Sequence, residues 1–472
     1  MFKIESAVSE VLTQSRIKVR PNAHLGVWLM YLLPFSLILC SIRHPHETSQ
    51  IYRLCSALSV GLMGTSLVFI LQCTRKKSLT FNRTLHLLPA ALTATAFRFW
   101  LHAGFFFSLI SGLISSVLYW RILLAVLYMF PLSFTLGEAA IAAQALILFL
   151  YSTVINVCNA SIRTPTKILD ISTLIIQVGL CAIGLICILM YRFKHLRNAL
   201  WFYTVSTIVL SLFVVILLHV LLLQSPILWI VTFLFEDVNR TKMVMYCAAC
   251  SVAAAVAIDR QIKGAEKATP AVRKVFHIFA VAVFLPGLLY HCSFIYLASG
   301  VVFGIFVSLE MLGILNIPPL GSSLQNGFVV YRDEKDTGTV ALTPLYLLVG
   351  CSLPVWIYPA PCDMLDSAGF NLLPVMSGVL AVGVGDTLAG AIGTKFGKHK
   401  WPGTKKTIEG TIGCICSQLI LVWVLIYLGY IGYNQHEVLK AVIAIVIGSL
   451  VEAKTTQIDN IVLPLVVFII LC

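Results

Sequence analysis

The segment 383–410 brings charged and flexible residues close together. Between Lys395 and Lys406 it carries five lysines and no acidic residue, interrupted by two glycines and a proline. Glycine and proline disfavour a regular helix, and lysines beside free backbone N–H groups make a pocket for an anion such as a triphosphate. A loop that only anchors the protein at the cytoplasmic surface explains the lysines equally well, but it explains neither the glycines nor the acids on both sides.

Carboxylates flank this loop and recur near the end of the chain. Asp386 ends an apolar run, where an acid costs much free energy and therefore indicates function; a helix-capping aspartate is the alternative. Asp459, followed by Asn460, stands ahead of an apolar tail. This position favours a metal ligand over a helix-capping residue. We expect Asp386 and Asp459 to hold Mg²⁺, a hard cation that prefers oxygen ligands. Glu409 holds either a loop lysine or a metal-bound water, or else forms a surface ion pair.

Four other ionisable residues adjoin apolar runs. Glu138 is a lone acid that either contacts substrate or pairs with an unidentified basic residue. Arg273 and His277, with Lys274 between them, lie on one face if the segment is helical, and they either touch a phosphate or anchor the chain at the interface. The P-loop and protein-kinase signatures are absent, so a nucleotide would be bound by a design of another kind.

The elements that must position these residues are membrane helices. Residues of the AVILMFWYC set make up 59% of the 472 residues, and charged residues only 11%, against about 25% in a soluble protein. This composition excludes a soluble enzyme, a disordered scaffold and a secreted disulfide module. The net charge of +13 suits cytoplasmic loops and phosphate-bearing partners. We expect no nucleic-acid partner, because no basic stripe with interleaved aromatic residues occurs outside the apolar segments.

The predicted fold class is all-α, a polytopic integral membrane helical bundle with about fourteen transmembrane helices and a cytoplasmic loop. The apolar runs that support this count lie at 25–42, 55–73, 104–119, 121–134, 137–158, 170–191, 200–235, 243–258, 275–291, 293–309, 340–358, 371–392, 411–432 and 437–451. Residues 461–472 are too short to cross alone, and 200–235 is one span or two. We divide the chain into a cytoplasmic N-terminal segment 1–24, a multi-span region 25–258 and a catalytic membrane domain 259–472.

Four charged segments are separated from one another by even numbers of predicted spans. They are 259–274, 332–336, 393–410 and 452–460. They therefore face the same side, and the lysine excess makes that side cytoplasmic, with the apolar turn 359–370 on the opposite side. The 14 cysteines, such as Cys40 and Cys181, are scattered through apolar runs, where we expect them to act as small hydrophobic residues.

Several motifs of the C-terminal half of the chain resemble those of a known superfamily. The motifs Asp386-Thr-Leu-Ala, Phe396-Gly-Lys-His and Lys405-Lys-Thr-Ile-Glu-Gly resemble the CTP-transferase superfamily, which includes phosphatidate cytidylyltransferases and polyprenol kinases. Ile408 stands where the cytidylyltransferases have a tryptophan, which favours the kinases. The closing stretch 451–465 is similar to that of dolichol, phytol and CTP-dependent diacylglycerol kinases, and stretches 134–138, 273–277 and 332–354 are similar to dolichol kinases in particular.

The resemblance implies CTP as donor, a divalent cation such as Mg²⁺, the endoplasmic reticulum membrane and an active site facing the cytoplasm. The acceptor it implies is dolichol or another polyprenol in the bilayer, which would yield dolichyl phosphate, the lipid carrier for protein glycosylation. The oligomeric state is not implied. The CTP-binding residues implied are Gly393, Thr394, Lys395, Phe396, Gly397, Lys398, His399, Lys400, Trp401, Pro402, Gly403, Thr404, Lys405, Lys406, Thr407, Ile408 and Glu409.

We hypothesise that Lys405 and Lys406 clamp the β- and γ-phosphates, because phosphoryl transfer needs positioning and charge neutralisation more than covalent chemistry. Asp386 and Asp459 hold the metal, and either Glu452 or Asp459 accepts the alcohol proton. The alternatives are a diacylglycerol or phytol kinase, a cytidylyltransferase, or a membrane transporter whose intramembrane acids form an ion path.

Overall fold

The computed structural model describes residues 2–76, 83–263, 270–324, 342–362 and 372–472 and positions 79, 338 and 340, and over these residues the chain is helical, with no strand. Helices satisfy all backbone polar groups internally, which apolar surroundings require. Within this part of the chain, nine helices are long and apolar enough to cross a membrane, and five shorter apolar helices accompany them. The predicted fold class is therefore confirmed, while the number fourteen stays a prediction.

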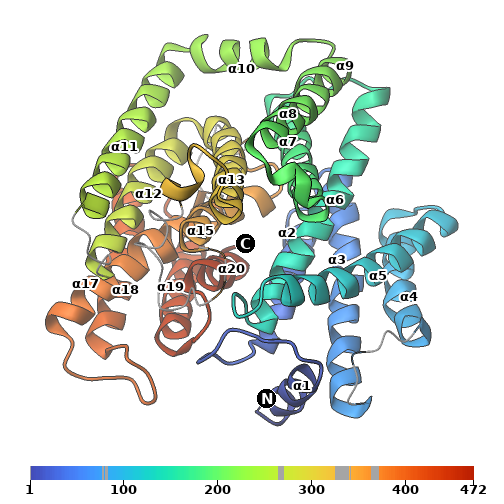
Figure 1. Cartoon of the computed structure of the whole chain (residues 1–472). Coiled ribbons are helices and arrows are strands. Elements are labelled where there is room, and N and C mark those ends of the chain that lie inside the picture. Colours follow the sequence, from blue (N-terminus) through green and yellow to red (C-terminus); the bar gives the residue numbers. More distant parts are fainter. Residues whose placement is uncertain are drawn as a thin grey trace.

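The first half of the chain forms one side of the molecule in Figure 1, and α10 bridges the two sides along the top. Its elements are α1 (Phe2–Gln14), η1 (Val27–Tyr31), α2 (Leu32–Arg43), α3 (Gln50–Leu71), η2 (Gln72–Lys76), α4 (Arg83–Leu101), α5 (Phe105–Met129), α6 (Leu136–Ile162), α7 (Ile168–Arg192), η3 (Lys194–Arg197), α8 (Ala199–Leu210), η4 (Ser211–Leu217), α9 (Leu218–Leu222) and α10 (Pro226–Phe235).

The second half lies opposite and ends in the buried helix α20. Its described elements are α11 (Val238–Lys263), α12 (Pro270–Tyr290), α13 (Cys292–Leu315), α15 (Thr343–Ile357), α16 (Leu372–Val375), η6 (Val379–Asp386), α17 (Thr387–Phe396), α18 (Ile408–Tyr427), α19 (Gln435–Lys454) and α20 (Asp459–Leu471). The predicted segment 332–336 lies outside the described residues.

Two predicted boundaries were wrong or undecided. The runs 104–119 and 121–134 are one helix, α5, because Arg121 alone does not interrupt a helix and no Gly or Pro lies between Gly112 and Met129. The run 200–235 is two pieces: the span 199–222, and then α10, which starts with Pro226 at its first position and Ser225 as its N-cap.

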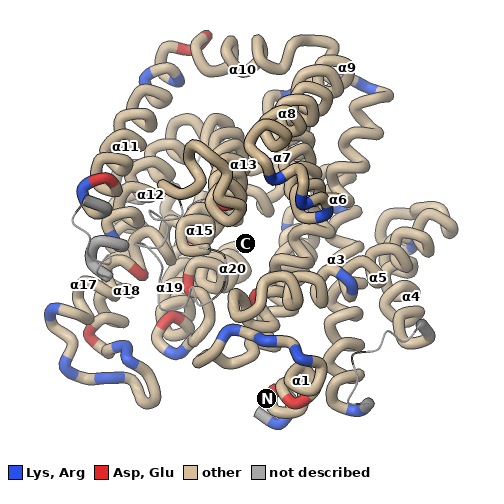
Figure 2. Tube along the Cα trace, in the orientation of Figure 1, with Lys and Arg blue, Asp and Glu red and all other residues tan. Residues whose placement is uncertain are grey.

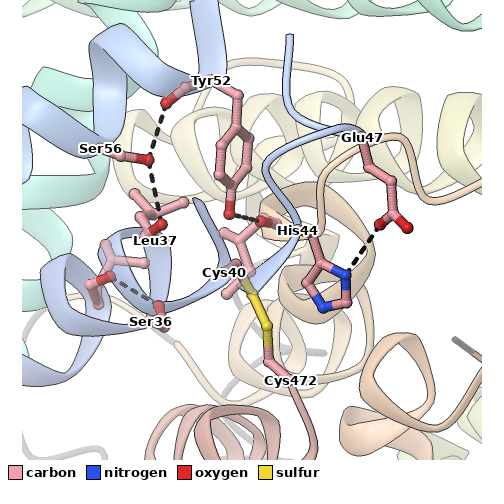
Figure 3. The surroundings of a disulfide bond; sticks show 10 residues. Ser36, Leu37, Cys40, His44, Glu47, Tyr52, Ser56 and Cys472 are labelled. Atoms are coloured by element: carbon pink, nitrogen blue, oxygen red, sulfur yellow. Dashed lines mark hydrogen bonds and ion pairs between the residues drawn. A yellow bond between two sulfur atoms is a disulfide. The ribbon is translucent and has the colours of Figure 1, made fainter. Parts of the chain in front are cut away.

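Four of the cysteines form disulfide bonds, which corrects the expectation that they act as small hydrophobic residues. Cys40 near the end of α2 pairs with Cys472 after α20, with Cα atoms 6.0 Å apart. Cys292 pairs with Cys362, with Cα atoms 5.3 Å apart. Figure 3 shows Cys40 and Cys472 beside Tyr52, whose hydroxyl donates to the backbone oxygen of Ile357 at 2.7 Å.

The disulfides lie at the far ends of helices that begin near the charged segments predicted above. Helix α20 begins at Asp459 and has 13 residues before Cys472, a length of about 20 Å at 1.5 Å per residue. Helix α12 carries Lys274 near its start and ends at Tyr290, two residues before Cys292. The charged segments and the disulfides therefore lie at opposite ends of these helices.

Close packing of the first turn of α6 against the N-terminal segment yields a stability prediction. A Cβ atom on Gly137 would lie 2.1 Å from the backbone oxygen of Gly26. We expect Gly137→Ala to lower the free energy of unfolding by about 1–3 kcal/mol, the usual cost of overpacking, measured as a lower thermal midpoint in detergent. Gly184→Ala is the matched control, because a Cβ there meets nothing within 4 Å. An equal response of the two variants would contradict this packing.

Candidate active site

Three carboxylates from three elements meet at one point. Asp386 ends η6, Glu452 lies in the last turn of α19, and Asp459 begins α20. One oxygen from each side chain lies within 4.8 Å of the other two, and all three groups are mostly withdrawn from solvent. Like charges this close repel each other unless cations neutralise them, so the cluster needs positive charge from protein or ligand.

Asp386 is the last residue of the π-helix η6. π-Helical turns are uncommon and frequently occur at functional sites, because the extra residue per turn redirects the side chains that follow. Here the π-helix Val379–Asp386 passes directly into the α-helix that starts at Thr387. The change of helix type thus occurs at the acidic residue itself.

Helix α12 supplies the first basic side chains to the cluster. The Nζ atom of Lys274 forms an ion pair with Asp386 Oδ2, and His277 Nε2 lies 3.5 Å from the same oxygen. Lys274 and His277 are one helical turn apart, so both side chains reach the acid from one face. The predicted pairing of Arg273 with His277 on one face involves a side chain outside the described residues, and the predicted contact of these residues with a phosphate stays a prediction.

Lys406 supplies the second cation, from the loop between α17 and α18. Its Nζ lies 2.5 Å from Glu452 Oε1, 3.4 Å from Asp459 Oδ2 and 2.6 Å from the backbone oxygen of Glu452. Burial alone would lower the pKa of Lys406, but the attraction of Asp459 and Glu452 outweighs it and raises the pKa above its ordinary value. Lys406 is therefore charged at neutral pH.

The loop that carries Lys406 folds as a short hairpin. Lys400 and Thr407 form an isolated antiparallel bridge, Trp401 N–H donates to Lys406 O at 2.9 Å, and Ile408 N–H donates to His399 O at 2.8 Å. Gly403, with φ +75°, occupies the tip, a conformation that suits glycine. The Thr407 hydroxyl then caps α18 by accepting from Gly410 N–H.

The two adjacent lysines of this hairpin differ in their surroundings. Lys406 turns inward and is partly buried, whereas Lys405 is exposed, as are Lys395, Lys398 and Lys400. In Figure 2 the basic residues of this loop and those of the segment between α1 and η1 lie at the same end of the molecule. Residues from three of the four predicted charged segments meet at the carboxylate cluster: Lys274 of 259–274, Lys406 of 393–410, and Glu452 and Asp459 of 452–460.

Glu409 braces the hairpin, which gives a prediction about nucleotide affinity. Its carboxylate accepts from His399 N–H at 3.2 Å and lies 2.7 Å from His399 Nδ1. We expect Glu409→Gln to raise KM for the nucleotide about tenfold, because a charge-assisted hydrogen bond is weakened, with little change in kcat. Steady-state kinetics against nucleotide concentration measure it, and an unchanged KM would remove Glu409 from this role.

Glu138, for which a substrate contact or a basic partner was predicted, has a basic partner. Its side chain is fully buried, and Oε1 lies 2.6 Å from Arg20 Nη2 and accepts from Ile458 N–H at 2.8 Å. Oε2 accepts from Thr135 N–H at 2.9 Å in a capping box. Glu138 thus pairs with a basic residue, the alternative left open above.

Asn460, the second residue of α20, lies next to the cluster, with its backbone oxygen against Gly350.

Arg20 and Gln457 were missed as members of this region. Arg20 is 3% exposed and lies in the segment 1–24, which was predicted only to be a cytoplasmic N-terminal segment. The signal that pointed to it was Glu138, because a buried acid in apolar sequence requires a cation. Which cation it was depended on the tertiary fold.

The sequence of the chain is similar to those of several known proteins. A family model described as dolichol kinase matches residues 110–332, a range that ends before Asp386. The chain is 35% identical over 361 residues to dolichol kinase from Bos taurus and, equally, to that from Homo sapiens. The chain belongs to the dolichol kinase family.

These matches cover only part of this chain and part of each relative. Each mammalian match covers 73% of this chain and 66% of the relative, so the chain spans slightly less than two thirds of the length of these relatives. Dolichol kinase from Saccharomyces cerevisiae is 26% identical over 251 residues, which are 53% of this chain and 45% of the relative. No solved structure matches the chain.

Proposed function

We propose that this protein is a CTP-dependent dolichol kinase, which transfers the γ-phosphate of CTP to the terminal hydroxyl of dolichol and releases CDP. The single observation that carries the proposal is the meeting of Asp386, Glu452 and Asp459 with Lys274 and Lys406 beside a lysine-rich hairpin. Membership of the dolichol kinase family supports the same activity. A lipid alcohol held by the membrane helices would meet the nucleotide at this end of the molecule.

A divalent cation such as Mg²⁺ fits the donor set of this site. Three carboxylates with oxygens within 4.8 Å of one another are hard oxygen donors. Asp386 and Asp459 would hold the ion, with Glu452 beside them. When bound, the ion would neutralise charge on the phosphates.

The protein's own residues then have distinct tasks. Lys406, together with backbone amides of the hairpin, would hold the transferred phosphate and stabilise the charge that spreads over its oxygens. Lys274 and His277 approach Asp386 from helix α12 and would fix the orientation of the Asp386 side chain. Either Glu452 or Asp459 would accept the proton of the alcohol as its oxygen attacks phosphorus.

The oxidised cysteines support an endoplasmic reticulum orientation with the active site facing the cytoplasm. Disulfides persist in oxidising compartments such as the endoplasmic reticulum lumen and are rare in the cytosol. Both disulfides lie at the end of α12 and α20 that is remote from the acids. A lumenal disulfide end and a cytoplasmic acid end agree with the lysine excess of the hairpin.

Transfer of label tests the activity. Purified protein is incubated with dolichol and CTP labelled either at the γ- or at the α-phosphate, and with diacylglycerol, phytol and phosphatidate as competing acceptors. Label from the γ-position on dolichol supports the proposal. Label from the α-position on phosphatidate would assign a cytidylyltransferase instead, and nucleotide-independent ion flux without turnover would assign a transporter.

Epitope accessibility tests the orientation. The turns around Gly403 and Tyr433 lie at opposite ends of α18. We expect an epitope inserted after Gly403 to bind antibody in sealed microsomes, and one inserted after Tyr433 to bind only after detergent is added. The reverse pattern would place the active site in the lumen and contradict the proposal.

A further inference from the structure

The segment 455–458 joins two of the carboxylates, because it connects Glu452 on α19 to Asp459 on α20. A segment this short, without a helix of its own, does not determine by itself the direction in which α20 starts. Something else must fix the position of Asp459 relative to Glu452. The structure shows contacts from the first 140 residues of the chain at three consecutive positions of this segment.

At Thr456, the backbone oxygen accepts from Arg20 Nη2 at 3.3 Å, and the hydroxyl accepts from His24 N–H at 3.0 Å. Both donors come from the segment between α1 and η1. The first position is therefore held through both its backbone and its side chain.

At Gln457, the side chain is held at both ends. Its Oε1 accepts from the Thr135 hydroxyl at 2.6 Å, and its Nε2 donates to His24 O at 2.7 Å. Gln457 is only 2% exposed, so water does not compete for these hydrogen bonds. A buried amide with both groups satisfied has a unique orientation.

At Ile458, the backbone N–H donates to Glu138 Oε1 at 2.8 Å. Glu138 is itself held by Arg20 and by its capping box with Thr135. The next residue is Asp459. The buried carboxylate of Glu138 therefore holds the residue directly before Asp459. Loss of the charge on either Glu138 or Arg20 would leave the other charge buried without a counter-ion.

We propose that Arg20, Glu138 and Gln457 form a positioning network that sets Asp459 in register with Asp386 and Glu452, so that the N-terminal region completes the cation site of the C-terminal region. This inference rests on the proposed function for its reaction, but its first consequence is cation binding. The three residues are positioning residues, because none of them contacts the carboxylate oxygens of the cluster in the described hydrogen bonds. Outer residues that orient ligands typically affect metal affinity or activity by about 10- to 100-fold.

Mn²⁺ binding by the full-length protein in detergent, followed by electron paramagnetic resonance, tests the network without CTP or dolichol. We expect Glu138→Gln and Gln457→Met each to raise the Mn²⁺ dissociation constant by about 10- to 100-fold. Arg20→Met combined with Glu138→Gln should raise the dissociation constant by less than the product of the two single-variant factors, because the two residues form one buried ion pair and act as a unit. Glu437→Gln is the control, since this acid lies on the same helix as Glu452 and pairs with Lys440 near the helix start.

The outcomes separate the inference from the proposed activity. A purely structural role would reduce the yield or thermal stability of the variants and leave the dissociation constant of the folded protein unchanged, which would overturn the inference, as would an absence of Mn²⁺ binding by the wild type. If Glu138→Gln does not fold, Gln457→Met, which alters no charge, decides by the same readout. Weakened Mn²⁺ binding in a protein that never phosphorylates dolichol would uphold the network and reject only the activity.

Discussion

Lys406→Met is expected to lower kcat by about a hundredfold to a thousandfold, the usual cost of removing one group that stabilises transition-state charge. Lys406 is the hairpin lysine whose Nζ lies among the carboxylates, 2.5 Å from Glu452 Oε1. Its raised pKa keeps it charged throughout the neutral range. Methionine keeps much of the side-chain length and removes only the charge and the hydrogen-bond donors. Phosphorylation of dolichol at saturating CTP measures the effect.

Lys405→Met is the matched control, because the two lysines are adjacent but Lys405 is exposed, whereas Lys406 is partly buried and lies 3.4 Å from Asp459 Oδ2. We expect Lys405→Met to change KM for CTP by a few fold and kcat hardly at all, in agreement with the modest energy of exposed ionic contacts. Equal losses in the two variants would show that the hairpin acts through its total charge, and would contradict a special position for Lys406.

Asp386→Asn is expected to lower kcat by about a thousandfold or more. A metal ion supplies several kcal/mol of charge stabilisation, and each 1.4 kcal/mol corresponds to a factor of ten in rate. The asparagine has nearly the same shape, but it is a weaker ligand for a hard cation and no longer balances Lys274. The rate is measured over a range of Mg²⁺ concentrations, where we expect the apparent Mg²⁺ requirement to rise as well.

Two further variants distinguish the metal role from the ion pair. Asp386→Asn combined with Lys274→Met removes both charges, so it should recover thermal stability but not activity. Asp237→Asn, in the turn before α11, keeps the hydrogen bond from Asn239 and lies far from the cluster; it should leave the rate unchanged. Recovery of activity in the double variant would show that Asp386 only compensates Lys274.

The residues of the candidate site were largely predictable, whereas their arrangement was not. Asp386 and Asp459 are recognisable in the sequence because an acid beside an apolar run carries a high free-energy cost. Glu452 and Lys406 were also predicted, but Lys405 and Lys406 are equivalent in sequence. The hairpin, in which Trp401 pairs with Lys406 and His399 pairs with Ile408, brings the Lys406 ammonium group to the carboxylates.

Sequence by itself determined that the chain is helical, membrane-embedded and charged mainly in a few segments. These properties follow from the length of apolar runs and from the cost of unpaired backbone groups and charges in hydrocarbon, which act within some twenty residues. The even spacing of spans also predicted that the charged segments lie together, and residues of the segments 259–274, 393–410 and 452–460 do meet at the carboxylate cluster.

Tertiary structure alone decided which distant residues meet. Ile458 N–H donates its hydrogen bond to Glu138, 320 positions earlier, and Cys40 pairs with a cysteine 432 positions later. Many partners satisfy the local requirement of a buried acid or a cysteine equally well, and the choice among them depends on how the helices pack. The same packing brings the N-terminal segment against residues 456–458 and thereby sets the position of Asp459.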